Sequence, residues 1–309
     1  MSKMCGSGMR AAMFAHDMLL AGSAEVMVAG GMESMTNAPY LLQKARGGYR
    51  IGHDRIFDHM MLDGLEDAYE PGRAMGTFGE DCAAKYQFSR EQQDAFAMES
   101  VKRAKAATES GAFAAEITPV TVKDRSGERV VSIDEGPGRV KLDKIPTLKP
   151  AFKKDGTITA ASSSSINDGA AALVMMRASM AEKLGCQPLA RLVSHAVHAQ
   201  EPGWFTTAPI GATQKALAKA GWSVQDVELW EVNEAFAVVP MALMRDLGVP
   251  HEKVNVHGGA CALGHPIGCS GARIMVTLMY ALKARGLKRG VATLCIGGGE
   301  GTAVALEML

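Results

Sequence analysis

The chain has 309 residues, 47% of them hydrophobic, and its 33 basic and 33 acidic side chains give a formal net charge of zero. A chain of this length can bury one large core or two ordinary ones, and the balanced charge argues against nucleic acid or anionic membrane surfaces as general partners. No apolar run reaches the about eighteen residues that a transmembrane helix needs. The six cysteines form no C-x-x-C pair, so we expect a reduced, cytoplasmic protein without a disulfide framework.

The chain begins with a cysteine-containing turn, Cys5-Gly6-Ser7-Gly8, followed by apolar residues at helical spacing up to Gly22. The N-terminus of a helix offers free N–H groups and the positive end of the helix dipole. Both favour the thiolate, so the sequence predicts a lowered pKa for Cys5. Turns of this kind usually follow a strand, whereas only four residues precede this cysteine.

The segments that follow alternate between strand-like and helix-like patterns. Residues 25–31 are typical of a buried strand, and residues 38–80 have no clean periodicity, which indicates a functional surface excursion. A helix is expected over 89–111, because Ser89 and Gln92 have the spacing of a capping box.

From residue 166 onward, short apolar runs alternate with helical patterns up to the C-terminus. This alternation predicts an α/β fold with buried, largely parallel strands. Ser179, with Glu182 three residues later, and Asn233 are the expected N-caps of two of its helices.

An internal repeat relates the two ends of the chain. Ser7-Gly8-x-Arg10 matches Ser270-Gly271-x-Arg273, and each is followed by a helix, a strand and a glycine-rich turn. We therefore predict a duplicated architecture, with halves at about 1–180 and 187–309. About eighty residues of strand and helix precede the second turn and only six residues precede the first serine, so we expect the first repeat to be incomplete.

Four turns each present one reactive side chain, namely Cys5, Asn233, His265 and Cys295. Taken singly, a cysteine is often a small core residue, a histidine a satisfied polar group and an asparagine a helix cap. Together they offer a nucleophilic thiol with a base, N–H donors for an oxyanion, and a second thiol for proton transfer. The combination predicts acyl-transfer chemistry.

Two other interpretations of these turns fit the sequence less well. Cys261-x-x-x-His265-x-x-x-Cys269 has the spacing of metal ligands on one helix face, but Gly264 and Pro266 make a continuous helix there improbable, and a fourth ligand is missing. The glycine-rich runs lack the patterns of phosphate-binding loops.

The motifs MCGSGMRA, VMVAGGMESMTNAPY, INDGAAALV, EVNEAFA, VNVHGGACALGHPIGCSGAR and CIGGGEGTA together resemble those of the thiolases, over essentially the whole chain. The resemblance implies an α/β, duplicated thiolase fold, layered α-β-α-β-α, with an inserted loop region over about 38–157. It also implies a homo-oligomer, a dimer or a tetramer, acting on acyl-CoA thioesters. With the repeat, it implies that the chain lacks roughly the first eighty residues of the family.

The resemblance implies a role for each reactive residue in a reversible Claisen condensation and thiolysis. Cys5 would carry the acyl group, and His265 would activate it. His265 and a water held by Asn233 would line one oxyanion hole, and the N–H groups of Cys5 and Gly297 the other. Cys295 would be the acid and base at the alpha carbon. No metal or prosthetic group is implied, since coenzyme A is a substrate and product.

By the same resemblance, four positions would line the coenzyme A site: Met75, Phe152, Ala160 and Ser164. Three departures from the family leave the acyl-chain preference open: Ala74 in place of histidine, the stretch 205–209, and Ser162 in place of asparagine.

Three functions therefore remain as alternatives. The first is condensation of two acetyl-CoA molecules to acetoacetyl-CoA, and the second is thiolysis of longer 3-ketoacyl-CoA substrates. The third is a catalytically inactive chain that binds acyl-CoA or protein partners without turnover.

Overall fold

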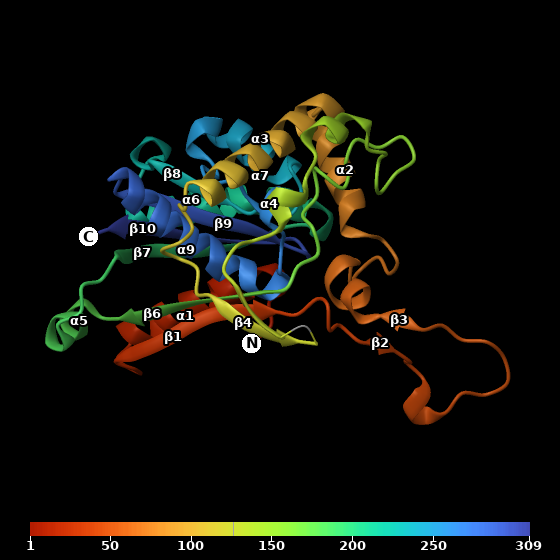
Figure 1. Cartoon of the computed structure of the whole chain (residues 1–309), viewed down its shortest axis with the longest axis horizontal. Coiled ribbons are helices and arrows are strands. Elements are labelled where there is room, and N and C mark those ends of the chain that lie inside the picture. Colours follow the sequence, from red (N-terminus) through yellow and green to blue (C-terminus); the bar gives the residue numbers. More distant parts are fainter. Residues whose placement is uncertain (126) are drawn as a thin grey trace.

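Two helices lie between two β-sheets in the computed structural model, which describes residues 1–125 and 127–309 (Figure 1). The helices α1 (Ser7–Leu20) and α9 (Ile267–Arg285) pack against each other, and both contact the sheet formed by β1 (Val26–Glu33) and β6 (Gly169–Met176). On its other side α9 contacts the second sheet. That sheet has the order β7-β10-β9-β8, with the bounds Ala190–Ala199, Glu300–Met308, Arg289–Ile296 and Leu229–Val232.

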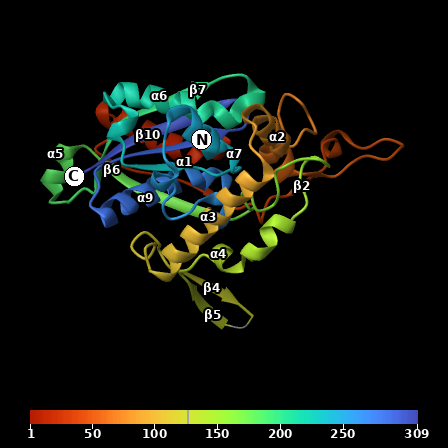
Figure 2. The same cartoon turned by 90° about the horizontal axis from the view of Figure 1, so that it is seen from above.

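The far face of the second sheet is covered by α6 (Ala208–Ala220), which packs on β7 and β10, and α7 (Val238–Leu247) packs beside α6. Two shorter helices connect the larger elements, namely α5 (Ala178–Leu184), which is labelled in Figure 2, and α8 (Ala260–Leu263). The expected cap of α5 is wrong, because that helix begins at Ala178 with Arg177 as its N-cap, and Ser179 lies inside it.

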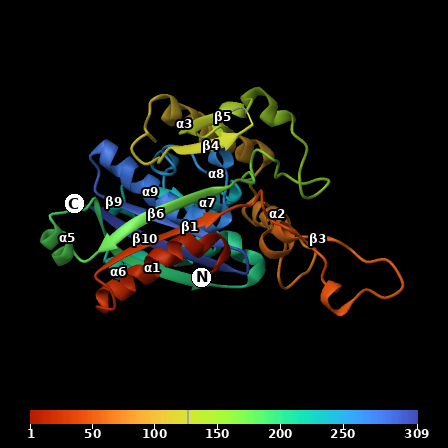
Figure 3. The ribbon, with the colours of Figure 1, turned by 60° about the horizontal axis from the view of Figure 1, so that its bottom comes forward.

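Four layers, β-α-β-α, are formed by the described residues instead of the five expected. Nothing in this part of the chain covers the outer face of β1 and β6, where Val28, Met32 and Val174 are 71%, 75% and 68% exposed (Figure 3). The strand predicted at 25–31 is present, but the prediction that it is buried is wrong for this reason; only Ala29 of β1 is buried.

The expectation of largely parallel strands is also wrong. β8 and β9 form a parallel pair, whereas β1–β6, β7–β10 and β9–β10 are antiparallel. The cause lies partly in the turn between β9 and β10. Gly298 and Gly299 adopt φ values of +95° and +92° there, which allow the chain to reverse within a few residues.

The two copies of the repeat pack directly on each other through their glycines. A Cβ atom at Gly8 would lie 2.8 Å from the Ala272 nitrogen, and one at Gly271 would lie 2.5 Å from the Met9 nitrogen. The Ser-Gly-x-Arg pattern is thus explained by close approach of α1 and α9, since only glycine leaves room for the facing backbone.

We expect Gly8→Ala to destabilise the fold by about 1–3 kcal/mol, because the added methyl must displace the backbone of α9. Gly47→Ala is the matched control, since nothing lies within 4 Å of its Cβ position. Urea unfolding followed by circular dichroism measures both variants. Equal midpoints for Gly8→Ala and the wild type would contradict the tight packing of α1 on α9.

The segment between β1 and β6 holds two longer helices, α2 (Met75–Tyr86) and α3 (Arg90–Glu109), and a short one, α4 (Gly136–Arg139). The pair β2 (Tyr40–Leu41) and β3 (Phe57–Asp58) extends away from the main body, as does the hairpin of β4 (Val120–Asp124) and β5 (Gly127–Val131) (Figures 1 and 2).

The capping box predicted for α3 is confirmed. The Gln92 N–H donates to Ser89 Oγ at 3.2 Å, and the Ser89 N–H donates to Gln92 Oε1 at 2.9 Å. Among the helices of the described ranges, none is both long and apolar enough to cross a membrane.

Candidate active site

Cys5 lies in a short 3-10 turn, Met4–Gly6, directly before α1. The side chain of Ser7 holds this turn, since its Oγ donates to the Met4 carbonyl at 2.8 Å and accepts the Lys3 N–H at 2.8 Å. Gly6 faces the end of β9, where a Cβ atom would lie 2.4 Å from Ile296 Cδ1. The cysteine is therefore fixed next to the turn that follows β9.

Two further predicted site groups meet Cys5 at this place. The backbone N–H groups of Gly297 and of Cys5 itself lie close enough to the Cys5 sulfur to lower the pKa of its thiol. Cys295, near the end of β9, lies close enough to Cys5 that a charge on one thiol raises the pKa of the other. The structure thus brings together the two sulfurs and the pair of N–H donors expected to face an oxyanion.

The prediction that the helix lowers the pKa of Cys5 is wrong. Burial raises the pKa of the Cys5 thiol to about 11, although the N–H groups of Gly297 and Cys5 offset part of this increase, and the carboxylate of Glu33 adds to it. Burial also raises the pKa of Cys295 well above its ordinary value. Both groups are neutral thiols at neutral pH, so Cys5 needs a base at the moment of attack.

Alkylation by iodoacetamide should therefore be slow at Cys5 and rise about tenfold for each pH unit up to about pH 11. Cys186 is exposed, while Cys82, Cys261, Cys269 and Cys295 are buried, so Cys186 should react first. Peptide mass spectrometry after timed alkylation at several pH values gives the order of reaction. A plateau of the Cys5 rate below pH 8 would contradict the raised pKa.

His265 is held by contacts at both of its ring nitrogens. Its Nδ1 lies 2.5 Å from Ser270 Oγ, which donates its own proton to the Pro266 carbonyl at 3.0 Å. Nδ1 therefore carries the ring proton, and the unprotonated Nε2 accepts a hydrogen bond of 3.4 Å from Asn233 Nδ2. Burial, together with the charge of Arg273, lowers the pKa of His265 to about 4. A neutral imidazole with an unprotonated Nε2 is the form that accepts a proton.

Asn233 does not cap a helix, contrary to one expectation, because α7 begins at Val238 with Ala237 as its N-cap. The asparagine comes directly after β8, and its N–H donates to the Thr293 carbonyl of β9 at 3.0 Å. Its side-chain Oδ1 is buried and has no protein partner. A buried acceptor in this position is suited to hold a water molecule or a substrate group.

The four reactive turns lie at one end of the second sheet, where β8 and β9 finish. β8 and β9 are parallel, so Asn233 and Cys295 lie near the same ends of neighbouring strands. α9, which begins just after His265, and β9 both pack against the turn of Cys5. The prediction that distant turns meet is supported by these contacts.

Met75 and Phe152 contact this region directly. Met75 Sδ is 3.3 Å from the position of a Cβ atom at Gly297. Phe152 packs on Gly76 and meets Phe236 edge to face, with 5.8 Å between ring centres.

Ala160 and Ser164 belong to a segment that hydrogen-bonds to both the Asn233 turn and the His265 turn. The Ser164 N–H donates to the Ala235 carbonyl at 3.0 Å, and the next residue, Ser165, accepts the His265 N–H at 3.0 Å. Ala160 is exposed in a turn closed by the bond from the Thr159 N–H to Ser162 Oγ. The segment bridges two of the reactive turns, and Ala160 is its outermost candidate.

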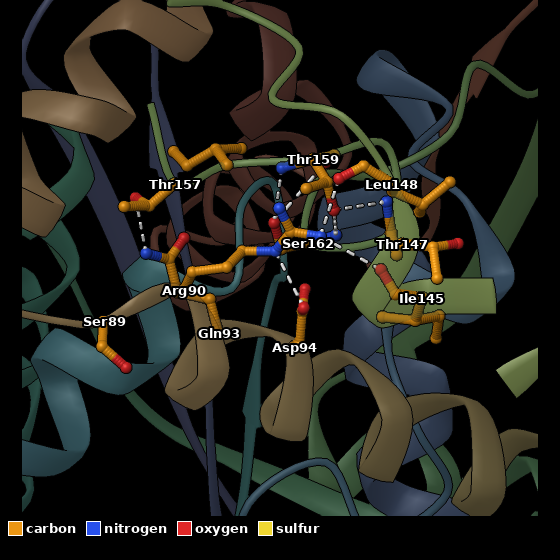
Figure 4. A network of polar contacts seen from close by, with 12 residues as sticks. Ser89, Arg90, Gln93, Asp94, Ile145, Thr147, Leu148, Thr157, Thr159 and Ser162 are labelled. Carbon is orange, nitrogen blue, oxygen red and sulfur yellow. Dashed lines mark hydrogen bonds and ion pairs between the residues drawn. The ribbon is translucent and has the colours of Figure 1, made fainter. Parts of the chain in front are cut away.

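A polar network anchors the chain before this segment to α3 (Figure 4). Arg90 forms an ion pair with Asp94 at 2.8 Å and donates to the carbonyls of Ile145 and Leu148 at 3.1 and 2.9 Å. Gln93 donates to Thr157 Oγ1 at 2.8 Å. These contacts fix the approach to the candidate coenzyme A site.

Sequence reasoning missed two side chains that organise the site. Ser270 orients His265, and Glu234 is a buried acceptor for the Ser100 hydroxyl, the Asn255 amide and the Cys261 N–H at 2.7–3.0 Å. Ser270 could have been found from the repeat, because its partner Ser7 also bonds a backbone carbonyl in the reactive turn preceding it. For Glu234 the sequence has no comparable signal.

The expected interruption between Cys261 and Cys269 is confirmed. α8 ends at Leu263, Gly264 has φ +88°, and α9 begins at Ile267. Cys261, His265 and Cys269 therefore do not share one helix face, and His265 is directed toward Asn233 and Ser270 instead.

Two family models match this chain, the thiolase N-terminal domain over residues 1–179 and the thiolase C-terminal domain over residues 186–308. The chain is 48% identical to the acetyl-CoA acetyltransferase of Chromobacterium violaceum over 305 residues, covering 98% of this chain and 78% of the relative.

Solved structures agree with these matches. The Bacillus anthracis acetyl-CoA acetyltransferase is 43% identical with a TM-score of 0.96, and an Ascaris suum thiolase in complex with coenzyme A is 41% identical with a TM-score of 0.93. Each similarity covers 100% of this chain and 78% of the solved one. The chain belongs to the thiolase family and has the thiolase fold.

Proposed function

We propose that this protein is an acyltransferase that converts two acetyl-CoA molecules reversibly into acetoacetyl-CoA and coenzyme A. The observation that carries the proposal is the packing of the Cys5 turn against the end of β9, where Cys295 lies and Gly297 follows. The similarity to acetyl-CoA acetyltransferases supports the choice of substrate.

The first step forms a thioester between Cys5 and the acetyl group. The Cys5 sulfur attacks the carbonyl carbon of acetyl-CoA while His265 Nε2 accepts the thiol proton. The N–H groups of Cys5 and Gly297 already face this sulfur, and they donate to the oxygen of the tetrahedral intermediate. The bond to the coenzyme A sulfur then breaks, and the proton on His265 passes to that leaving group.

The second step joins a second acetyl-CoA to the enzyme-bound acetyl group. The Cys295 thiol first gives its proton to His265 Nε2, and the Cys295 thiolate then removes a proton from the methyl carbon of this second thioester. The resulting carbanion attacks the carbonyl carbon on Cys5. A water bound to Asn233 Oδ1, with the imidazole of His265, lies on the side where the enolate oxygen develops. The Cys5 thiolate leaves and takes the proton that His265 holds, while Cys295 keeps the proton from the methyl carbon, so all three groups return to their starting states.

Because the pKa of Cys295 is raised by burial, its thiolate must form within the closed site, and a thiolate with a raised pKa is a stronger base. The proposed substrate site, lined by Met75, Phe152, Ala160 and Ser164, would take the pantetheine arm of each coenzyme A in turn. No metal or prosthetic group enters these steps. We further propose that the protein acts in the cytoplasm and that it forms a homo-oligomer. Light scattering of the purified protein tests the oligomeric state.

Cleavage of acetoacetyl-CoA by coenzyme A tests the proposal. We expect acetyl-CoA as the product and parallel lines in double-reciprocal plots, which indicate a covalent intermediate. A series of 3-ketoacyl-CoA substrates should show the highest kcat/KM for the four-carbon substrate. Higher values for longer chains would favour the second alternative, and folded protein without turnover of any member would favour a non-catalytic binding function.

A further inference from the structure

Outside the active site, one carboxylate and two imidazoles meet between α1 and β7. His195 Nε2 lies 2.8 Å from Asp17 Oδ1, and His16 Nδ1 lies 3.4 Å from the same oxygen. The ligand atoms of the three residues all lie within 4.8 Å of one another, and no other group of this kind occurs among the described residues.

The three side chains come from both halves of the chain. His16 and Asp17 belong to α1, whereas His195 belongs to β7, where it pairs with Val304 of β10. Lys219 of α6 donates to the His195 carbonyl at 3.0 Å and so fixes the strand from its other side. The cluster therefore lies across an interface whose two sides are held by separate contacts.

Burial differs among the three side chains in a way that suits a ligand site. The side chains of His195 and His16 are 13% and 20% exposed, whereas Asp17 is 52% exposed. The imidazoles are thus held in place by their surroundings, while the carboxylate side of the cluster is open to solvent. An ion could enter there and keep a water molecule as an additional ligand.

The spacing fits a tetrahedral ion bound by nitrogen and oxygen. Zinc bonds of about 2.0–2.1 Å place neighbouring ligand atoms about 3.3 Å apart and the centres of two bound imidazoles about 5 Å apart. The distances from Asp17 Oδ1 to His195 Nε2 and His16 Nδ1, 2.8 and 3.4 Å, lie on either side of the expected ligand spacing. The ring centres of His16 and His195 are 5.2 Å apart. Two imidazoles and a carboxylate are also a donor set that zinc takes in proteins.

We propose that His16, Asp17 and His195 bind a zinc ion, with water as the fourth ligand, and that this ion joins α1 to the edge strand β7. The site is separate from the proposed catalytic residues, none of which takes part in it. The other interpretation is a metal-free hydrogen-bond cluster in which Asp17 accepts from both imidazoles, and the experiment below distinguishes the two.

Calorimetric titration of the metal-free protein with Zn²⁺ tests the proposal. We expect one site in the wild type whose affinity falls at least about tenfold in His16→Gln and His195→Gln, since each loses a ligand. His59→Gln is the matched control, because His59 lies 3.5 Å from Asp63 in an exposed pair that has no third ligand. That variant should bind like the wild type.

Binding of Zn²⁺ by cysteine thiols would persist in all of these variants, so equal affinity throughout would overturn the proposal, as would a wild type that binds no zinc. Circular dichroism establishes that each variant is folded. Saturating Zn²⁺ should raise the Tm of the wild type and of His59→Gln, but not that of His16→Gln.

A measurement on the wild type alone keeps the test independent of the variants. Co²⁺ in the site should give the visible absorption of a tetrahedral ion with nitrogen and oxygen ligands. A sulfur-to-cobalt charge-transfer band in the near ultraviolet would place the ion on thiols instead and would contradict the assignment.

Discussion

Cys5→Ser is expected to reduce both condensation and thiolysis by at least about 10³-fold, because the hydroxyl that replaces the thiol is a much weaker nucleophile in the same turn. The variant should keep the fold, since Ser7, not Cys5, holds the Met4–Gly6 turn. Steady-state rates with acetoacetyl-CoA and coenzyme A give the size of the loss.

Cys186→Ser is the matched control for this loss. Cys186 is exposed at the end of α5 and is distant in sequence from every reactive turn, so its replacement should leave kcat and KM unchanged. Retention of more than about a tenth of the wild-type rate by Cys5→Ser would contradict the role of Cys5 as the acyl carrier.

Cys295→Ser is expected to separate the two steps of the reaction. Acylation of Cys5 should continue, because His265 accepts the proton in that step, whereas condensation should fall by about 10²–10⁴-fold with the loss of the base at the alpha carbon. Rapid-quench experiments with radiolabelled acetyl-CoA measure the acylation, and product formation measures the condensation. Equal loss of both steps would contradict the assignment of Cys295.

How well the sequence predicted each element depends on how local its determinants are. The capping box of α3 needs only Ser89 and Gln92, and it was predicted correctly because both partners lie within one helical turn. The antiparallel pairing of β9 and β10 was not predicted, because the glycines between them, residues 297–299, are equally compatible with a substrate site and with a reversal of the chain. Strand direction then depends on Gly298 and Gly299 adopting positive φ, which the sequence permits but does not require.

The candidate site shows the same division between motif and environment. The reactive turns could be identified from their residues, and their convergence followed from the α/β alternation and the family resemblance. The protonation states of the reactive side chains could not be predicted, since they depend on burial by segments far away in the sequence. The helix N-terminus favours the Cys5 thiolate, but the loss of water around the sulfur outweighs this effect and raises its pKa to about 11.

The partners in some contacts could not be predicted from the sequence. The repeat could have indicated Ser270, but only the structure shows that its hydroxyl lies 2.5 Å from the imidazole of His265. Likewise, His16 and Asp17 have no distinguishing pattern until β7 brings His195 beside them.

The central claim is that the acyl group passes through the sulfur of residue 5. Its most direct test is to mix the protein with acetyl-CoA alone, quench in acid, and map the acetyl group by peptide mass spectrometry. We predict one acetyl group on the peptide that contains Cys5, and its loss when free coenzyme A is added before the quench. An acetyl group on Cys295 instead, or none on any cysteine of a preparation that turns over acetoacetyl-CoA, would contradict the account.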